Sequence, residues 1–356
     1  MSINSVITGT GRCIPLIVKK NSDFIDSTFL NEDGSPFLYE NEIIIQKFKE
    51  ITGIEERRYA QDDLNASDLG FFAAEKAIKK GKIDKNTIDQ IIVAHNFGDV
   101  SSDSIQGDNL PSLASKIKNK LNILNPNCIA YDLVFGCPGW VQGIIQAEAF
   151  IKSGIAKTVL VIGTETLSRV VDVFDRDSMI YGDGAGAVII ESQESNEQIG
   201  ILSHTSQTFT EEETNYLFFG ESNKGNDKDS TKYLKMHGRK IYEFALNNVP
   251  NAMKNALDKS GVSISKVKKI LIHQANEKMD EAIVKRFYKL HKTPMPKGLM
   301  PMSIHKLGNS SVATVPTLLD LILDGEMENQ EINKGDVIIL ASVGAGMNIN
   351  AVVYKY

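Results

Sequence analysis

Short apolar runs alternate with amphipathic and polar stretches along the 356 residues of the chain. The runs are too short for buried helices and lack strict alternation, which is typical of strands that are buried on both faces. Such strands are expected over residues 5–11, 91–94, 128–134, 158–163 and 185–192. Helices are expected between them, over residues 67–80 and from Cys137 to a glycine cap at Gly154. This order of elements predicts an α/β fold.

Polar stretches interrupt this pattern and are expected to be irregular. They cover residues 22–51, 98–111, 165–179 and 209–232. The first contains Asn31-Glu32-Asp33-Gly34, which is a typical turn sequence. The last is acidic and then rich in glycine and lysine. A surface loop of this kind often borders a binding site, but an insertion without a role has the same composition.

The second half of the chain repeats the pattern of the first. Residues 77–93 align without a gap on residues 256–272, so that a helix end, a polar break and an apolar strand coincide. At nearly the same offset, residues 157–163 align on residues 335–341. Any two βαβ units share some likeness, yet the ungapped register favours a duplicated α/β unit. We therefore expect two halves, residues 1–195 and residues 196–356.

Composition and charge narrow the class of protein. The chain is 42% hydrophobic with a net charge of −6, which argues against general binding to nucleic acid. Its N-terminus lacks the basic and apolar segments of a signal peptide. No apolar run reaches the ~20 residues that a membrane-spanning helix needs. These features predict a soluble cytoplasmic protein with no membrane partner.

The cysteines are few and widely spaced. Cys13, Cys128 and Cys137 form no metal-ligand spacing, so we expect no bound metal, and their small number suits a reducing compartment. Cys137 follows Phe135-Gly136 on a predicted strand-to-helix turn, and Pro138 suits the first helical turn. The positive end of that helix favours a thiolate, which is the nucleophilic form. The alternative is a small core residue, as most free cysteines are.

Two residues of the second half are candidate partners for Cys137. His273 directly follows the apolar strand 270–272, and ligands of α/β folds gather at such strand ends. Asn309 precedes a helix expected over residues 311–323, which mirrors the helix after Cys137. Alone, the histidine would be read as structural and the asparagine as a helix cap. Together at equivalent points of the repeat, the three residues are a candidate catalytic set.

These residues lie in motifs that resemble a known family. VFGCPGW, HQAN, LGNSSVATVP and LSRVVDVFDRDSMIYGDGAGAV are similar to motifs of β-ketoacyl-acyl carrier protein synthase III, in the thiolase superfamily. The resemblance covers nearly the whole chain. It implies a thiolase-like fold in which duplicated α/β halves form α-β-α-β-α layers, and a homodimeric enzyme.

The resemblance also implies a reaction. Cys137 would be acylated by a thioester, and a malonyl-type thioester on a carrier protein would then lose CO2 and attack the acyl group. His273 and Asn309 would donate hydrogen bonds to the thioester oxygen as it becomes negative. The backbone N–H groups of Cys137 and Ala345 would form the oxyanion hole for the acyl carbonyl. No cofactor is expected beyond the acyl-coenzyme A or acyl-carrier protein substrates.

The donor-binding positions depart from the family pattern. A tryptophan and an arginine that help hold coenzyme A are replaced by Lys47 and Ile51, whereas Arg176 matches the second adenine-contacting arginine. These departures therefore favour an acyl donor bound to a carrier protein over acyl-coenzyme A. Trp140, where the family commonly has phenylalanine, is expected to pack in the core.

A basic helix face is the candidate docking site for an acyl carrier protein. Lys278, Lys285 and Lys289 share one face of the helix after HQAN, and the resemblance places docking residues at Lys278, Lys285 and Arg286. Carrier proteins are acidic, so a basic face on an acidic protein is suited to them. The alternative is a face that is only solvated.

Several functions remain open at this point. Chain initiation or elongation in fatty-acid or polyketide-like synthesis is the first. A specialised ketosynthase that joins a β-ketoacyl unit, as in dialkylresorcinol-type pathways, is the second. The others are acyl transfer without decarboxylation, with His273 as general base, and a non-catalytic partner subunit. The sequence does not fix the acyl chain length, the donor carrier, the extender unit or the pathway.

Overall fold

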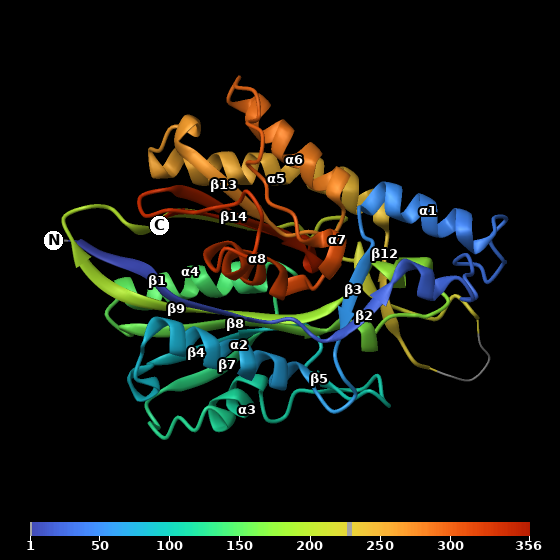
Figure 1. Cartoon of the computed structure of the whole chain (residues 1–356), viewed down its shortest axis with the longest axis horizontal. Coiled ribbons are helices and arrows are strands. Elements are labelled where there is room, and N and C mark those ends of the chain that lie inside the picture. The colour runs from blue at the N-terminus through green and yellow to red at the C-terminus, as the bar shows by residue number, and fades with distance from the viewer. Residues whose placement is uncertain (1, 226–229) are drawn as a thin grey trace.

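Two mixed β-sheets and the helices that cover them form the computed structural model, which describes residues 2–225 and 230–356 (Figure 1). The strand order is β1-β9-β8-β4-β7 in the first sheet and β10-β15-β14-β13 in the second. The first sheet contains β1 (Ser2–Cys13), β4 (Gln90–Ala94), β7 (Ile129–Leu133), β8 (Thr158–Thr166) and β9 (Asp183–Ser195). The second contains β10 (Gly200–Thr208), β13 (Val267–Ile272), β14 (Val337–Gly344) and β15 (Asn348–Lys355). Strand β4 runs parallel to β7 and β8, and β13 runs parallel to β14.

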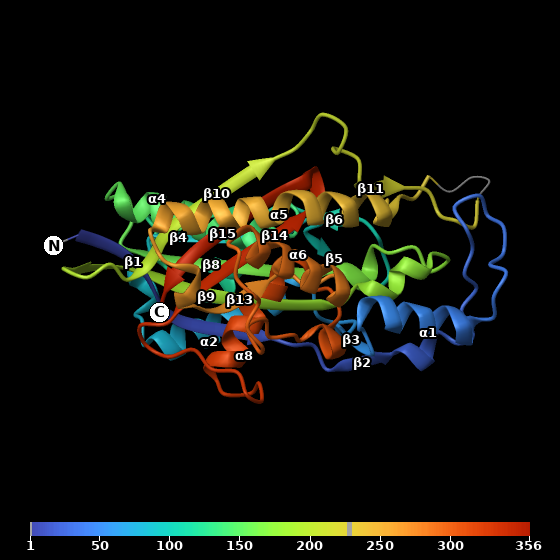
Figure 2. The ribbon, with the colours of Figure 1, turned by 90° about the horizontal axis from the view of Figure 1, so that it is seen from above.

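Helices lie outside both sheets and between them, which gives the α-β-α-β-α arrangement seen in Figure 1. They are α1 (Asn41–Thr52), α2 (Ala66–Gly81), α3 (Leu113–Lys120), α4 (Gly139–Lys152), α5 (Gly238–Ser260), α6 (Glu277–Leu290), α7 (Ile304–Leu307) and α8 (Thr314–Leu323). Helices α2 and α3 cover the first sheet, α4 and α8 lie between the sheets, and α5 and α6 lie side by side over the second sheet (Figure 2). The layered fold that the resemblance implies is confirmed.

The internal repeat is visible in the local structure as well as in the order of elements. Helix α2 leads through a short 3₁₀ turn into β4, and α5 leads through a similar turn into β13. Each turn is capped in the same way. The Asp84 side chain accepts a hydrogen bond from the Asn86 N–H, and the Ser263 side chain accepts one from the Ser265 N–H. These are matching positions of the ungapped alignment.

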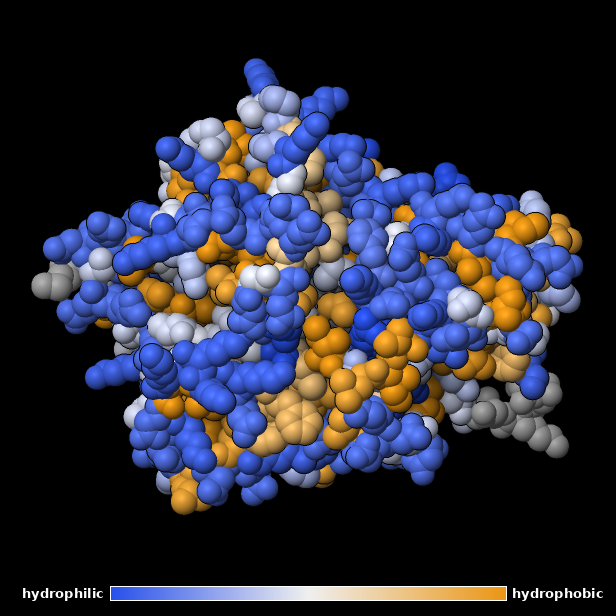
Figure 3. Space-filling model, viewed as in Figure 1, coloured by the Kyte–Doolittle hydropathy of each residue, from blue (hydrophilic) through white to orange (hydrophobic). Residues whose placement is uncertain are grey.

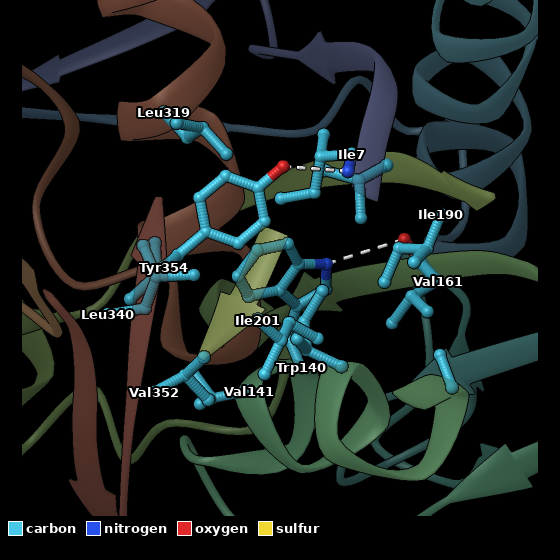
Figure 4. Close-up of a cluster of buried hydrophobic side chains, with 14 of the residues drawn as sticks. Ile7, Trp140, Val141, Val161, Ile190, Ile201, Leu319, Leu340, Val352 and Tyr354 are labelled. Atoms are coloured by element: carbon cyan, nitrogen blue, oxygen red, sulfur yellow. Dashed lines mark hydrogen bonds between the residues drawn. The ribbon is translucent and has the colours of Figure 1, made fainter. Parts of the chain in front are cut away.

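The layer between the sheets contains a large apolar core (Figure 4). Trp140 on α4 is 1% exposed, and its indole N–H donates to the carbonyl oxygen of Val161 over 3.3 Å. The Tyr354 hydroxyl accepts a 2.8 Å hydrogen bond from the Ile7 N–H, which ties β15 to β1. Both aromatic side chains therefore bury their rings while their polar atoms are satisfied. The core role expected for Trp140 is confirmed.

The face shown in Figure 3 is mainly hydrophilic, with apolar side chains grouped in patches. The exposed apolar residues of the chain include Leu16, Ile17 and Val18, at or just before strand β2 (Ile17–Lys20). Strand β2 pairs with β3 (Glu56–Tyr59) in a separate two-stranded sheet. Among the residues that the structure describes, none of the helices has the length and apolar character needed to span a bilayer.

The polar stretch over residues 22–51 is more regular than the sequence predicts. Its turn is as expected, since the Gly34 N–H donates to the Asn31 carbonyl over 2.9 Å. The following residues form α1, however, which buries Ile44 and Phe48 four positions apart and ends before Gly53 at φ +77°. Polar neighbours mask this apolar stripe, so the prediction of an irregular segment is wrong from residue 41 onward.

Two other predicted loops also contain strands. The 98–111 segment forms the short pair β5 (Asp99–Val100) and β6 (Gly107–Asp108). The segment predicted as a loop over residues 209–232 contains β11 (Leu217–Gly220), which pairs with β12 (Tyr233–Met236). Residues 226–229 of that prediction lie outside the described part of the chain. In both cases the paired strands are too short to give a clear apolar period.

Candidate active site

Cys137 lies on the turn between β7 and α4, where the sequence predicts it. Gly136 adopts φ +67°, a backbone conformation that favours glycine. A side chain at Gly136 would also clash with the backbone of Ala345, because its Cβ would lie 2.7 Å from the Ala345 nitrogen. Glycine is therefore required both for the turn and for the close approach of the loop after β14.

His273 and Asn309 are both buried, and each is fixed through its backbone. The His273 N–H at the end of β13 donates to the Ala341 carbonyl over 2.9 Å. Asn309 N–H donates to the Ile180 carbonyl and its own carbonyl accepts from the Gly182 N–H, each over 2.9 Å. Its Oδ1 accepts from the Ser311 N–H over 2.8 Å, which leaves the amide NH2 group as the donor.

One cavity of about 480 Å³ connects the three candidate catalytic residues. Cys137, His273 and Asn309 all line it, although they come from three separate loops. The rest of the lining is mainly apolar and includes Ile180, Leu217, Met236, Ile241, Met279 and Val343. An apolar cavity with a few convergent polar groups is the usual form of a small-molecule site.

The protein around the cavity keeps the cysteine and the histidine neutral. Cys137 is partly open to the cavity, yet its removal from bulk water raises the pKa of its thiol to about 11. Burial likewise lowers the pKa of His273 to about 4. The thiolate expected from the helix terminus is therefore not the resting state, because desolvation of the charge outweighs the hydrogen bonds from Ser311 and from the Cys137 backbone that lower the pKa. The resting site contains a thiol and a neutral imidazole.

Ser311 links the candidate residues to a buried carboxyl group. Its hydroxyl forms a hydrogen bond with Cys137 and accepts one of 3.2 Å from Asn96 Nδ2. The same Asn96 nitrogen donates to Glu165 Oε1 over 2.5 Å. Burial raises the pKa of Glu165 to about 8, so this side chain is mostly protonated at neutral pH. Ser311 itself is held at φ +52°, a strained conformation for a residue with a side chain.

The sequence reasoning did not identify this chain of contacts. Asn96 lies just after β4, and Glu165 lies near the end of β8. The sequence signal that could have identified Asn96 and Glu165 is their position as polar residues at the carboxyl ends of parallel strands.

The two proposed oxyanion-hole residues, Cys137 and Ala345, lie on loops that are tied together. A Cβ placed on Gly344 would lie 2.7 Å from the Cys137 nitrogen, so the two backbones are in close contact. Asn348 Nδ2 donates to the Ala345 carbonyl over 2.8 Å and to the Phe135 carbonyl over 3.3 Å. This side chain bridges the loop after β14 and the turn before Cys137. The role of the two N–H groups stays a prediction.

Arg176, the donor-binding candidate, lines this cavity, as do Lys47 and Ile51, the positions that depart from the family pattern. Arg176 lies with its guanidinium 5.2 Å from the ring centre of Phe37, and Lys47 Nζ lies 3.9 Å from the ring centre of Tyr39. Ile51 lines the same cavity and is exposed. The sequence departures at Lys47 and Ile51 are thus accompanied by aromatic rings from the segment before α1, which the sequence reasoning missed.

The segment that carries Arg176 is anchored by a buried ion-pair cluster. Lys235 on β12 donates to Asp172 over 2.6 Å and to Asp175 over 3.0 Å. Asn223 completes the cluster, since its Oδ1 accepts from Lys235 and its N–H donates to Asp172. The described parts of the 209–232 segment therefore border the cavity through Leu217 and fix the loop beside it.

The candidate docking residues lie on α6, whose apolar face packs on the core as expected. Lys278, Lys285 and Arg286 are exposed. Lys285 pairs with Glu281 over 2.7 Å, and Arg286 donates to the Leu246 carbonyl over 3.0 Å. Lys278 lies next to cavity-lining Met279, whereas the other two lie farther along the helix. The structure thus places one of the three next to a residue that lines the cavity.

The family models and the similar proteins of known name point to the same family. The family models for 3-oxoacyl-[acyl-carrier-protein (ACP)] synthase III and for its C-terminal part match residues 131–208 and 257–356. The chain is 33% identical over 354 residues to β-ketoacyl-[acyl-carrier-protein] synthase III 1 of Vibrio vulnificus (strain YJ016), with 99% of each chain covered.

Solved structures agree. The chain resembles 3-oxoacyl-[acyl-carrier-protein] synthase III from Aquifex aeolicus VF5, with a TM-score of 0.80, 28% identity and coverage of 99% of this chain and 100% of that one. It also resembles the priming β-ketosynthase of the R1128 polyketide biosynthetic pathway, with a TM-score of 0.80, 25% identity and coverage of 99% and 96%. The chain belongs to the β-ketoacyl-acyl carrier protein synthase III family of condensing acyltransferases.

Proposed function

We propose that the protein joins an acyl group to a malonyl-type unit by decarboxylative Claisen condensation. The observation that carries the proposal is the meeting of Cys137, His273 and Asn309 on one largely apolar cavity. Each residue has a separate task in the reaction. The family membership supports the same chemistry.

In the first half-reaction, the Cys137 sulfur attacks the carbonyl carbon of an acyl thioester. The carbon–sulfur bond to the donor carrier breaks, the acyl group stays on Cys137, and the thiol proton ends on the departing carrier thiol. The oxyanion of the tetrahedral intermediate would lie between the N–H groups of Cys137 and Ala345. Contact between Gly344 and Cys137, together with the Asn348 bridge, supports this placement.

In the second half-reaction, a malonyl-type thioester loses CO2. The electron pair of the broken carbon–carbon bond moves onto the thioester oxygen as an enolate, to which His273 and Asn309 donate hydrogen bonds. The enolate carbon then attacks the acyl carbonyl on Cys137, and the carbon–sulfur bond breaks to release a β-ketoacyl thioester. Neutral donors suit this step, and burial keeps His273 neutral.

Acyl transfer without decarboxylation fits the site less well. That reaction needs a base to deprotonate the incoming oxygen or nitrogen nucleophile. Burial lowers the pKa of His273 to about 4, so its imidazole is a weak proton acceptor near neutral pH. A non-catalytic role is also disfavoured, since Cys137, His273 and Asn309 are all present and line one cavity.

The substrates and partners follow from the surface around the cavity. We propose acyl-coenzyme A or acyl-carrier protein as donor, with Arg176 at the donor site, and a malonyl-carrier protein as extender, with no further cofactor. The acidic carrier would dock on Lys278, Lys285 and Arg286 of α6. Fatty-acid synthesis is the first pathway, and a polyketide-like or dialkylresorcinol-type pathway is the alternative.

We further propose a homodimer in the cytoplasm. Strand β7 is an edge of the first sheet, and Ile129 and Val134 at its ends are exposed apolar residues. An edge of this kind is suited to pairing with a second copy of the chain. The three cysteines are unpaired, which suits a reducing compartment. Sedimentation of the intact protein would test the dimer.

The function is tested by the intact mass of the protein after incubation with matched panels of acyl-coenzyme A and acyl-carrier protein donors. We expect one acyl group per chain, absent from the matched Cys137→Ser variant. Loading only from carrier-bound donors supports a specialised ketosynthase, whereas loading from short acyl-coenzyme A supports a synthase that initiates chains. Subsequent addition of malonyl-carrier protein should release a β-ketoacyl product and CO2. No loading from either panel would contradict the proposal.

A further inference from the structure

Tyr181 presents a buried hydroxyl group to the cavity without a strong hydrogen-bond acceptor. Its side chain lines the cavity and is 5% exposed. The hydroxyl contacts Met236 Sδ over 3.6 Å, and in the described parts of the chain it makes no other hydrogen bond. A thioether sulfur is a weak acceptor, so this donor is left nearly unsatisfied. Buried hydroxyl groups usually have a proper partner.

The direction of the Tyr181 side chain is fixed by its neighbour Asn309. The two residues form a parallel β-bridge, with the hydrogen bonds from Asn309 N–H to the Ile180 carbonyl and from Gly182 N–H to the Asn309 carbonyl on either side. Paired residues of a bridge direct their side chains to the same face. Tyr181 therefore faces the cavity together with a candidate catalytic residue, and this orientation is held by backbone contacts.

Tyr181 lines the same cavity as Cys137, the candidate nucleophile. Burial raises the pKa of Tyr181, and the negative charges of Asp177 and of an ionised Cys137 raise it further. The hydroxyl thus keeps its proton at neutral pH and is a hydrogen-bond donor in the cavity that also contains the sulfur that would be acylated. The side chains of Ile180, Leu217 and Met236 in the cavity wall carry no oxygen. Asp177 and Asn309 also line the cavity and carry oxygens, but neither accepts a hydrogen bond from the Tyr181 hydroxyl.

We propose that the Tyr181 hydroxyl donates a hydrogen bond to an oxygen on the β-carbon of the acyl group, so that the site selects β-ketoacyl donors over saturated donors of equal length. The inference rests on the proposed function, because it concerns the acyl group that Cys137 accepts. The thioester carbonyl itself is assigned to the N–H groups of Cys137 and Ala345. The β-keto oxygen is the next oxygen along such a chain, and condensation chemistry places one there.

A hydrogen bond to a substrate oxygen gives this kind of selectivity. A saturated acyl chain would leave the Tyr181 donor unpaired inside the complex, whereas a β-ketoacyl chain would satisfy it. Tyr181 is therefore a specificity-determining residue, and phenylalanine is the matched replacement because it keeps the ring and removes only the hydroxyl.

The test is a competition between 3-oxooctanoyl and octanoyl thioesters of whichever carrier loads Cys137, read as the ratio of the two adduct masses on the intact protein. The wild-type protein should favour the 3-oxooctanoyl donor. Tyr181→Phe should lower the ratio by about tenfold, as expected for loss of one buried hydrogen bond. Tyr288→Phe is the matched control, since Tyr288 is also buried, has no hydroxyl partner in the described residues and does not line the cavity.

The possible outcomes separate this inference from the proposed function. An unchanged ratio of the two adducts in Tyr181→Phe would overturn the inference. If the total loading also fell, the oxygen that pairs with Tyr181 would lie on the carrier arm, which both donors share. A wild-type protein that prefers octanoyl would overturn it without any variant, even where Tyr181→Phe fails to fold. In each of these cases Cys137 still loads, so the proposed function stands. If no donor of either panel loads Cys137, the proposed function fails and the inference fails with it.

Discussion

Asn96 Nδ2 donates to both Glu165 Oε1 and Ser311 Oγ, and so connects a buried carboxyl group to the serine that contacts Cys137. The negative charge of Glu165 raises the pKa of the Cys137 thiol. Because burial raises the pKa of Glu165 to about 8, this effect is switched on only as the pH passes that value. The protonation state of Glu165 thus sets the charge near Cys137, the candidate nucleophile.

This arrangement predicts a specific pH profile for alkylation of Cys137 by iodoacetamide. The wild-type rate should rise throughout pH 7–9 without a plateau, since the pKa of Cys137 is about 11. Glu165→Gln should react a few-fold faster above pH 8, where the wild-type carboxylate is charged, and equally fast near pH 6, where it is protonated.

The surface variant Glu194→Gln controls for a general change of charge, because Glu194 is exposed. Cys137→Ser gives the background from the other two cysteines. A wild-type rate that levels off near neutral pH would show a thiolate–imidazolium pair and contradict the neutral site.

The same carboxyl group should make stability depend on pH. The pKa of Glu165 rises on folding from 4.5 to about 8, so between these values the unfolded chain has lost a proton that the folded protein retains. Wild-type stability contributed by this site therefore falls as the pH rises from about 4.5 to about 8. Glu165→Gln removes this dependence on pH. The melting temperature of the variant minus that of the wild type should therefore become more positive by about 2 °C or more as the pH rises across this range. A difference that is constant with pH would contradict the raised pKa.

Asn348 should be needed for acylation although it does not touch the proposed reacting atoms. Its amide bridges the carbonyl groups of Ala345 and Phe135, which fixes the two proposed oxyanion donors relative to each other. Asn348→Ala should lower kcat/KM for acyl loading by roughly 10²-fold, as for a misplaced oxyanion hole. Asn251→Ala, an exposed site on α5, is the matched control. Normal loading by a folded Asn348→Ala protein would remove the bridge from the mechanism.

His273 and Asn309 should matter more for the second half-reaction than for the first. Both are assigned to the malonyl oxygen, whereas acyl loading is assigned to Cys137 and the backbone donors. His273→Ala and Asn309→Ala should therefore still load an acyl group but release CO2 from malonyl-carrier protein about 10²- to 10³-fold more slowly. Separate measurement of adduct mass and released CO2 distinguishes the steps. Equal loss of both steps would contradict this division of roles.

The basic face of α6 should affect carrier-bound substrates selectively. Lys278→Glu with Lys285→Glu should raise the KM for an acyl-carrier protein about tenfold relative to the KM for acyl-coenzyme A. Arg286 is a poorer test residue, because its hydrogen bonds to Leu246 and Asn247 also hold α6 against α5. Lys334→Glu is the matched control for added negative charge, because Lys334 is exposed and precedes β14, at the end away from Gly344 and Cys137. Equal KM changes for both donors would contradict docking on α6.

The parts of the site that follow strand ends could be predicted from the sequence. Cys137 and His273 follow the apolar strands β7 and β13, and Asn309 precedes the helix that the internal repeat matches to the helix after Cys137. Local composition locates the two strand ends, and the repeat locates the loop that contains Asn309. The family resemblance then supplied roles that the spacing alone left open.

The remaining features depend on contacts between distant segments. Asn96, Glu165 and Ser311 are far apart in the sequence and meet only through the packing of β4, β8 and the loop before α8. The raised pKa of Cys137 likewise depends on desolvation by surrounding segments, which the strand-to-helix turn in the sequence does not reveal. Helix α1 was missed because its buried positions, Ile44 and Phe48, lie among polar neighbours.

The burial of Cys137 has a consequence for survival of the enzyme under oxidative stress. Peroxides attack thiolates, and a thiol whose pKa is about 11 is almost entirely protonated near neutral pH. Burial raises the pKa of Cys13 and of Cys128 as well, so all three cysteines of the chain are poor targets. The raised pKa thus disfavours sulfenic acid formation at the candidate nucleophile, and in the proposed reaction its partner is instead a thioester held in the cavity.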